Sequence, residues 1–256
     1  MAWLSRRRER RAALAEGFRD EWRAAIDDWF EWRSGLDHDQ RSRHEALMMR
    51  LMFERRWEAG SGFELDDEVR LVIAALAARI AIGLPDDPFR TVTSILVQAD
   101  DVRMTGEFEQ VAGIVSDEES WVSGLSDPTG PVMLSWDAIC EDLDYPGDGR
   151  NLVYHEFAHQ LDQLDGHSDG VPPIPDAAAR TRFIEVCTAA YELAVRGEGA
   201  TTLDEYAGVN PAEFFAVATE AFFDAPMTLR GEHRQLYEVL SDYFGQDPAQ
   251  RPGAAN

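Results

Sequence analysis

The segment 151–164 constrains the fold of this 256-residue chain most, because its pattern predicts a helix with two unlike faces. The apolar face is formed by Leu152, Val153, Phe157, Leu161 and Leu164. The polar face carries His155, His159 and Asp162, and residues four positions apart in a helix lie one turn apart on the same side. The chain must therefore pack one side of this helix on a core while two imidazoles stand close together on the other side.

The order His-Glu-Phe-Ala-His at 155–159 is typical of a metal-binding helix. The imidazoles of His155 and His159 can reach one ion, and Zn²⁺ is the usual occupant of such a pair. Glu156 lies about 100° round the helix from His155, so it can stand beside the ion without binding it. There it would take a proton from water that the ion has made more acidic. The alternative is a chance match in an ordinary solvated helix, since the pattern fixes only three residues.

A catalytic zinc ion usually has three protein ligands, so two histidines leave one ligand to find. His167 does not fit the metzincin pattern, which needs Gly seven and His ten positions after the first His. This chain has Asp162 and Asp165 at those positions, so that class is excluded. Asp162 either orients an imidazole or simply solvates the helix, and the sequence leaves both interpretations open.

Glu213 is the better candidate for the third ligand. It follows Asn210 and Pro211 at the start of an otherwise apolar helix. Taken alone, this arrangement is explained more simply by helix capping, with Asn210 as the cap and Glu213 where a capping box places its acid. Glu220 lies seven residues further along the same face and is either a rival ligand or a carboxylate that supports one.

Tyr206 lies seven residues before Glu213, at the end of the preceding loop. A phenol near a metal ion can donate a hydrogen bond to the oxyanion that forms when water attacks a carbonyl. From the residues alone, a packed loop tyrosine is the simpler interpretation.

The charge balance excludes two classes of partner. The chain has 48 acidic and 24 basic residues, a net charge of −24, and all of its basic residues are arginine. Nucleic-acid binding depends mainly on contacts to phosphate, and anionic membranes attract basic surfaces, so neither is expected as a partner. Hydrophobic residues make up 45% of the chain, which is enough to bury a core and excludes a disordered acidic tail.

We expect a cytoplasmic protein. Cys140 and Cys187 are too few for a disulfide scaffold and are typical of buried thiols. No apolar run of the kind found in signal peptides follows the N-terminal arginines, and Arg79 interrupts the apolar stretch 71–84. The arginines form either a solvated helix start, which is the simpler interpretation, or an arm for an acidic partner; they are Arg6, Arg7, Arg8, Arg10 and Arg11.

The order of the predicted elements indicates an α+β fold, with helices first, then short strands, then helices again. Helices are expected at 5–34, 39–58, 66–83, 151–164, 177–196, 211–223 and 232–244. Strands are expected at 91–98, 111–115, 120–123 and 132–136. Residues 1–85 are expected to form a helical region packed on a core of residues 86–256, and the two together one compact unit.

Several stretches, in order from about Gly62 to Arg251, resemble the Mlc titration factor A family of bacterial zinc peptidases. They are Gly-Phe-Glu-Leu-Asp (62–66), Gly-Pro-Val-Met-Leu-Ser-Trp (130–136), His-Glu-Phe-Ala-His-Gln-Leu-Asp (155–162), Gly-Val-Pro-Pro-Ile-Pro (170–175), Asp-Glu-Tyr-Ala (204–207), Asn-Pro-Ala-Glu-Phe-Phe-Ala-Val (210–217) and Tyr-Phe-Gly-Gln-Asp-Pro (243–248). The resemblance implies a zincin-like core with a small mixed sheet and a gluzincin-like site, similar to the catalytic core of anthrax lethal factor.

The resemblance also assigns roles to residues that the pattern alone left open. It implies one zinc ion per chain, held by His155, His159 and Glu213, with Glu156 as the catalytic base and Tyr206 as the active-site tyrosine. Glu220 then becomes the less favoured ligand.

Two functions follow from the resemblance. The first is a zinc-dependent metallopeptidase, with aminopeptidase as the narrower expectation, that acts on small peptides with metal-activated water and Glu156 as general base. A strand at 132–136 would then lie at a sheet edge and hold an extended peptide. The alternative is an interaction protein that binds and sequesters a transcriptional repressor of sugar uptake, with peptidase activity secondary.

Overall fold

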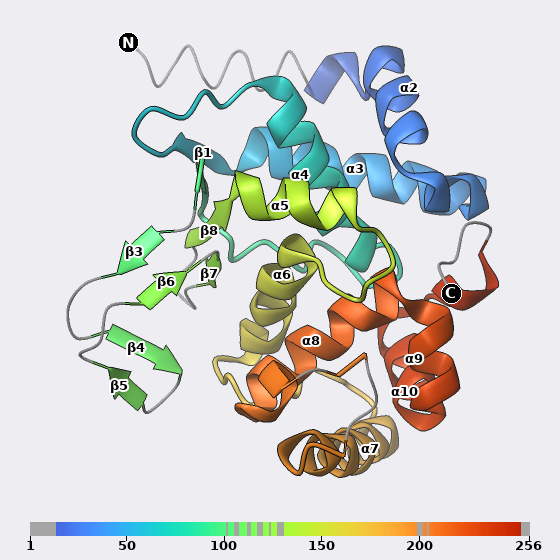
Figure 1. Cartoon of the computed structure of the whole chain (residues 1–256). Coiled ribbons are helices and arrows are strands. Elements are labelled where there is room, and N and C mark those ends of the chain that lie inside the picture. Colours follow the sequence, from blue (N-terminus) through green and yellow to red (C-terminus); the bar gives the residue numbers. More distant parts are fainter. Residues whose placement is uncertain are drawn as a thin grey trace.

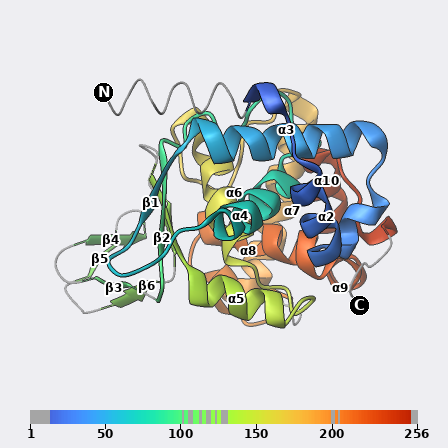
Figure 2. The ribbon, with the colours of Figure 1, turned by 90° about the horizontal axis from the view of Figure 1, so that it is seen from above.

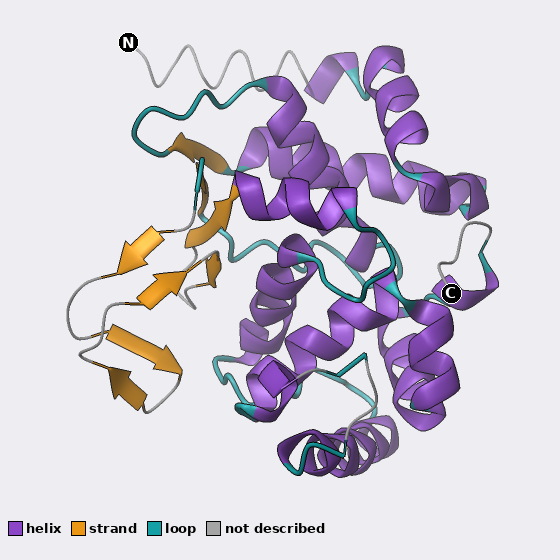
Figure 3. Ribbon diagram, viewed as in Figure 1, coloured by secondary structure: helices purple, strands orange, loops and turns teal. Residues whose placement is uncertain are grey.

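The computed structural model describes residues 14–100, 131–198, 202–203 and 205–251, and between 101 and 130 the strands within 102–126. Helices make up most of it, and the strands gather on one side of the molecule (Figures 1 and 3). The five N-terminal arginines lie outside the described residues, so the interpretation of that cluster stays a prediction. The α+β class is confirmed.

The N-terminal part contributes several helices, and the last of them, α4, is mostly buried. These elements are α2 (Asp20–Trp29), the 3₁₀ helix η1 (Glu31–Gly35), α3 (His38–Glu54) and α4 (Asp67–Ile80). Asp37 and Gln40 form a capping box at the start of α3, and Asp66 caps α4 by accepting a 2.9 Å hydrogen bond from the backbone N–H of Val69. Nearly all of α4 is buried, because it packs against α3 on one side and against α6 (Leu152–Asp162) on the other.

A four-stranded sheet has the order β1 (Arg56–Ala59), β2 (Ser94–Gln98), β8 (Pro131–Ser135) and β7 (Gly124–Ser126). The first three strands are parallel, and β7 runs antiparallel to β8. The expected edge position of the strand at 132–136 is therefore wrong, because β8 has a partner on each side. Strand β7 occupies the edge next to it, where residue 124 pairs with Leu134.

Other differences from the expected elements have local causes. The helix expected at 39–58 ends at Glu54, because the next four residues pair with β2 as strand β1. Trp136 begins α5 (Trp136–Asp144) rather than ending a strand, since Ser135 caps that helix by accepting a 3.3 Å hydrogen bond from Ala138 N–H. Both errors arise at junctions where sequence patterns change over one or two residues.

Two small antiparallel pairs interrupt the chain between β2 and β7. They are β3 (Val102–Met104) with β6 (Ser120–Val122), and β4 (Phe108–Val111) with β5 (Ile114–Ser116). Seen from the front and from above, these strands extend away from the helical body (Figures 1 and 2). The insertion therefore leads directly into the edge strand β7.

The C-terminal half surrounds α6 with helices. These are the 3₁₀ helix η2 (Gln163–Asp165), α7 (Ala177–Val195), η3 (Glu205–Gly208), α8 (Pro211–Asp224), α9 (Pro226–Glu232), α10 (Arg234–Phe244) and η4 (Pro248–Gln250). The short helix α9 was not expected. The two helices α6 and α8 pack closely together at the centre of the molecule (Figure 1).

Arg79 of α4 ties these two central helices to the N-terminal part. Its guanidinium donates hydrogen bonds to the hydroxyl of Tyr154 (2.8 Å) and to the carbonyl of Phe223 (2.9 Å). It also lies over the ring of Trp32, 4.4 Å from the centroid. Because the guanidinium is buried and joins three helices, it holds α6 and α8 in one fixed relation. Among the helices that the structure describes, none combines the length and apolar character needed to cross a bilayer.

Candidate metal centre

The start of α6 is fixed by three acceptors. The side chain of Asn151 caps the helix by accepting a 3.0 Å hydrogen bond from the backbone N–H of Tyr154. Asp142 accepts one of 2.7 Å from Leu152 N–H, and Glu220 one of 2.6 Å from Asn151 N–H. Because these contacts tie the start of the helix to α5 and α8, the helix presents its polar face at a fixed position.

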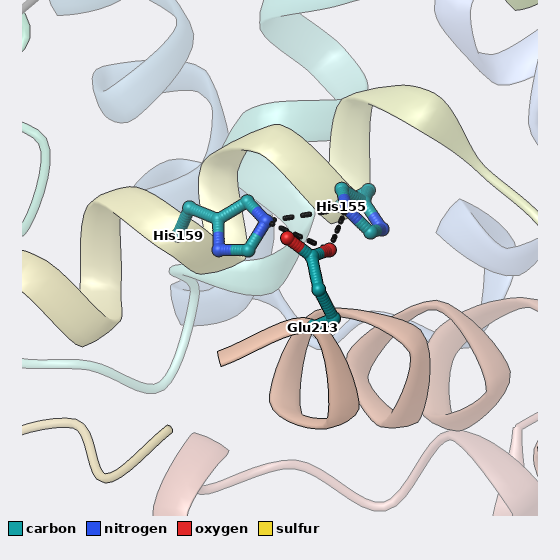
Figure 4. Close-up of side chains that lie close together, drawn as sticks. All are labelled: His155, His159 and Glu213. Atoms are coloured by element: carbon teal, nitrogen blue, oxygen red, sulfur yellow. Dashed lines mark hydrogen bonds and ion pairs between the residues drawn. The ribbon is translucent and has the colours of Figure 1, made fainter. Parts of the chain in front are cut away.

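His155 and His159 project from α6 toward Glu213 of α8 (Figure 4). Nε2 of His155 lies 3.2 Å from Nε2 of His159 and 3.1 Å from Oε2 of Glu213. Nε2 of His159 lies 3.4 Å from the same oxygen. The side chains are only 10–12% exposed, so the three atoms form a small triangle that is largely shielded from solvent.

The size of this triangle fits a zinc ion. Tetrahedral zinc with bonds of 2.0–2.1 Å to nitrogen and oxygen places neighbouring ligand atoms about 3.3 Å apart. The three separations, 3.1, 3.2 and 3.4 Å, agree with that value. Two imidazole nitrogens and one carboxylate oxygen are also the donor types found in catalytic zinc sites with one open position. The residues present therefore fit the ion.

The charges in the site are strongly coupled. Burial works to lower the pKa of His155, but the negative charges and hydrogen bonds of Glu220 and Glu213 outweigh it and raise that pKa well above its usual value. Burial works to raise the pKa of Glu213, but the hydrogen bonds and charges of the two histidines hold it well below its usual value. Glu213 is therefore an ionised carboxylate, which is the form that binds a cation.

Glu213 can take part in the cap of α8 and also be a metal ligand, because the two roles use different parts of the residue. The Asn210 side chain caps α8 by accepting hydrogen bonds from Ala212 N–H (2.8 Å) and Glu213 N–H (3.0 Å). The carboxylate of Glu213 points to the histidines (Figure 4). The cap thus uses the backbone of Glu213 and leaves its side chain for the site.

Glu156 lies beside the triangle and is buried. Its Oε2 has no hydrogen-bond partner within the described part of the chain. Burial raises its pKa, although the positive charges of the histidines oppose this. A methyl group placed on Gly124 of β7 would overlap Oε1 of Glu156, so the edge strand and the carboxylate are in direct contact. An unpartnered buried oxygen costs free energy, and a chemical role would explain why this cost is tolerated here.

Tyr206 lies next to His155, with 5.9 Å between the ring centroids. It belongs to η3, which packs against α7 and α8, and its hydroxyl donates a hydrogen bond to Glu213. Burial, together with the negative charge of Glu213, raises its pKa, so the hydroxyl keeps its proton at neutral pH. The ring is still half exposed, which allows an incoming molecule to contact it.

Of the two roles considered for Glu220, the structure favours the carboxylate that supports a ligand, and of the two considered for Asp162 it contradicts solvation of the helix. Nδ1 of His155 donates a 2.7 Å hydrogen bond to Glu220, which lies behind the triangle and is not one of its three corners. Asp162 is completely buried and does not solvate the helix; it accepts a 3.0 Å hydrogen bond from Gly170 N–H. His167 lies exposed in the loop after η2. Cys140 and Cys187 are free thiols.

Two glycines at the site were missed because a glycine in a loop or strand carries no chemical signal of its own. Gly124 allows Glu156 to lie against β7, and Gly170 lies against the start of α8. The motif at 170–175 is visible in the sequence, but the contact of Gly170 with Pro211 depends on how this loop packs against α8.

Comparisons with known proteins cover nearly the whole chain. The model of a family described as glucose-regulated metallo-peptidase M90 matches residues 3–245. An uncharacterized protein of Synechocystis is 34% identical over 231 residues, which is 89% of this chain and 84% of the relative. Proteins named Mlc titration factor A are 31% identical in Escherichia coli, over 87% of this chain and 85% of the relative, and 32% identical in Enterobacter, over 85% and 83%. The matched region includes both helices that carry the metal-ligand candidates.

Proposed function

The chain belongs to the glucose-regulated metallo-peptidase M90 family, and we propose that it is a zinc-dependent peptidase whose ion is held by His155, His159 and Glu213. The observation that carries this proposal is the spacing of the three ligand atoms, which lie 3.1–3.4 Å apart at the meeting point of α6 and α8. When bound, zinc supplies a Lewis acid that polarises a carbonyl and makes water a better nucleophile near neutral pH.

Glu156 acts as the general base in this proposal. Its Oε2 is buried and unpartnered within the described residues, and its raised pKa brings it closer to neutrality, where proton transfer is most effective. It takes a proton from the attacking water and returns one to the amine that leaves.

Tyr206 stabilises the oxygen of the scissile carbonyl as it becomes negative. Its hydroxyl remains protonated, because burial and neighbouring carboxylates raise its pKa. It can therefore exchange its hydrogen bond with Glu213 for one with the substrate.

Strand β7 holds the substrate in an extended form through hydrogen bonds between the two backbones. The strand lies at the edge of the sheet and Gly124 contacts Glu156, so a peptide paired with β7 would pass beside the base. Cleavage at the N-terminus, which an aminopeptidase performs, is part of the proposal. The two free thiols suit the reducing cytoplasm in which we place this activity.

The test combines metal analysis of the purified protein with digestion of a peptide library, with and without a chelator. We expect about one zinc per chain and cleavage that stops with chelator and returns when zinc is restored. Product masses distinguish removal of N-terminal residues from internal cleavage. Cleavage that is unaffected by complete metal removal would contradict the proposal.

A second function is supported by the name of the enterobacterial relatives, Mlc titration factor A. We propose that this chain also binds a transcriptional regulator protein. Capture of such a regulator equally by the wild type and by Glu156→Gln would support binding that is independent of catalysis. Failure of both proteins to bind any purified repressor of sugar uptake from the host would contradict it.

A further inference from the structure

Asp162 is a buried carboxylate that forms no ion pair with any of the residues that the structure describes. It is the last residue of α6, three positions after His159, and its side chain is fully inaccessible to solvent. Its Oδ2 accepts a 3.0 Å hydrogen bond from Gly170 N–H, and its Oδ1 has no partner in the described part of the chain. The carboxylate also accepts a backbone hydrogen bond from Val171. Burial of a carboxylate that leaves one oxygen unpartnered is unfavourable, so a neutral residue would be preferred here if packing were the only requirement.

Gly170, which donates this hydrogen bond to Asp162, has a left-handed backbone conformation and lies against the start of α8. Gly170 has φ = 74°, a backbone conformation that favours glycine. A methyl group on Gly170 would overlap the carbonyl oxygen of Pro211, so the backbones of the two residues touch. Pro211 is the first residue of α8, two positions before Glu213.

These contacts form a short connection between the two helices that carry the ligand candidates. It runs from Asp162, at the end of α6, through Gly170 to Pro211, at the start of α8. We propose that Asp162 is a positioning residue, which sets the distance of Glu213 from His155 and His159 by fixing Gly170 against Pro211. This inference depends on the proposed zinc site, and concerns what keeps the distances between its three ligand atoms constant.

The competing explanation is that the packing of α6 on α8 alone sets that distance. Both helices are largely buried and have an extensive shared interface. Loss of Asp162 would then change stability without changing zinc affinity in particular.

The first experiment measures zinc affinity by competition with a chelator for Asp162→Ala and Asp162→Asn. The amide oxygen of Asn can still accept from Gly170 N–H, so we expect affinity within about threefold of wild type for D162N. We expect a loss of about 10–100-fold for D162A, comparable to the loss of residues that orient metal ligands.

The second experiment uses two glycines of the same loop. Gly166 and Gly170 both have positive φ, 91° and 74°, but nothing lies within 4 Å of a methyl group placed on Gly166. Gly170→Ala should weaken zinc binding at least tenfold more than Gly166→Ala, although both substitutions introduce similar backbone strain. This pair decides the question if D162A does not fold.

A double-mutant cycle with Glu213→Ala separates positioning from general destabilisation. If Asp162 acts through Glu213, D162A should cause no further loss of zinc affinity in the chain that already lacks the Glu213 carboxylate. The inference would be overturned if D162A lowered zinc affinity equally in the wild-type chain and in the Glu213→Ala chain. Zinc affinity equal to that of the wild type in D162A or G170A would also overturn it. Absence of zinc binding by the wild type would instead contradict the proposed function.

Discussion

Nδ1 of His155 donates a hydrogen bond of 2.7 Å to Oε1 of Glu220, and this contact joins α6 to α8 directly behind the three ligand atoms. Oε2 of Glu220 accepts a second hydrogen bond, of 2.6 Å, from the backbone N–H of Asn151. The carboxylate thus fixes the orientation of the imidazole and leaves Nε2 facing Glu213 and His159. Carboxylates in this position also increase the basicity of a metal-binding histidine.

Glu220→Ala should lower zinc affinity by about 10–100-fold, because His155 loses the group that orients its ring and favours the correct tautomer. Competition with a chelator at fixed pH measures this. Glu192→Ala removes the same charge from an exposed position on α7 and should leave the affinity unchanged. Equal affinity of the Glu220→Ala variant and the wild type would show that the hydrogen bond to His155 has no part in metal binding.

Glu156→Gln should retain zinc but lose nearly all turnover. The amide has almost the same shape as the carboxylate and keeps the contact with Gly124, but it cannot accept a proton from water. Zinc content and kcat are measured on the same preparation. Retained hydrolysis in this variant would rule out Glu156 as the general base.

Gly124→Ala tests whether the edge strand positions that base. The added methyl group would overlap Oε1 of Glu156 and displace the carboxylate. A displacement of about 1 Å can cost on the order of 100-fold in rate, so we expect kcat to fall by about 10–100-fold while zinc affinity stays the same. Gly231→Ala is the control, because nothing lies within 4 Å of a methyl group there. Unchanged kcat in Gly124→Ala would mean that Glu156 has another acceptable position.

The helices of the site were predictable because their signals are local. The period of the apolar residues and Asn151 before them mark the start of α6, and Asn210-Pro211 marks the start of α8. The pair His155 and His159 follows from helical geometry alone. Their proximity to Glu213 does not, because it depends on how two helices separated by about fifty residues pack, and only the family resemblance pointed to it.

The sheet was less predictable than the helices, because its strands depend on contacts between segments that are distant in the sequence. Strand β1 exists because Arg56–Ala59 meets β2, and four residues of mixed polarity carry no clear period by themselves. The position of β8 inside the sheet likewise depends on β7, which was not expected and which pairs from across an inserted segment. Roles of Gly124 and Gly170 could not be predicted, since each depends on an atom from a distant part of the chain.

Tyr206→Phe removes only the hydroxyl that we place on the developing oxyanion. We expect kcat to fall by about 100-fold with little change in KM or zinc content, because the interaction is made mainly in the transition state. Tyr145→Phe, at an exposed tyrosine of the α5–α6 connection, controls for the substitution itself. A change confined to KM would assign Tyr206 to substrate binding.

The buried carboxyl group of Asp142 makes the free energy of unfolding depend on pH, and this effect is separate from catalysis. Burial raises its pKa from 3.8 to about 7, although it accepts a hydrogen bond from Leu152 N–H at the start of α6. A carboxyl group whose pKa is higher in the folded than in the unfolded state binds its proton more tightly when folded. Its contribution to the free energy of unfolding is therefore complete below about pH 4 and is lost as pH rises through about 7.

Asp142→Asn should remove this loss, because the amide oxygen can still accept from Leu152 N–H but cannot ionise. At pH 8 we expect the variant to have a free energy of unfolding on the order of 2 kcal/mol above that of the wild type, and at pH 4 the two should agree. Urea unfolding at a series of pH values measures the difference, with the exposed Asp28→Asn as control. A variant less stable than the wild type at pH 8 would show that the ionised carboxylate stabilises the start of α6 through its contact with the helix N-terminus, with burial the weaker effect.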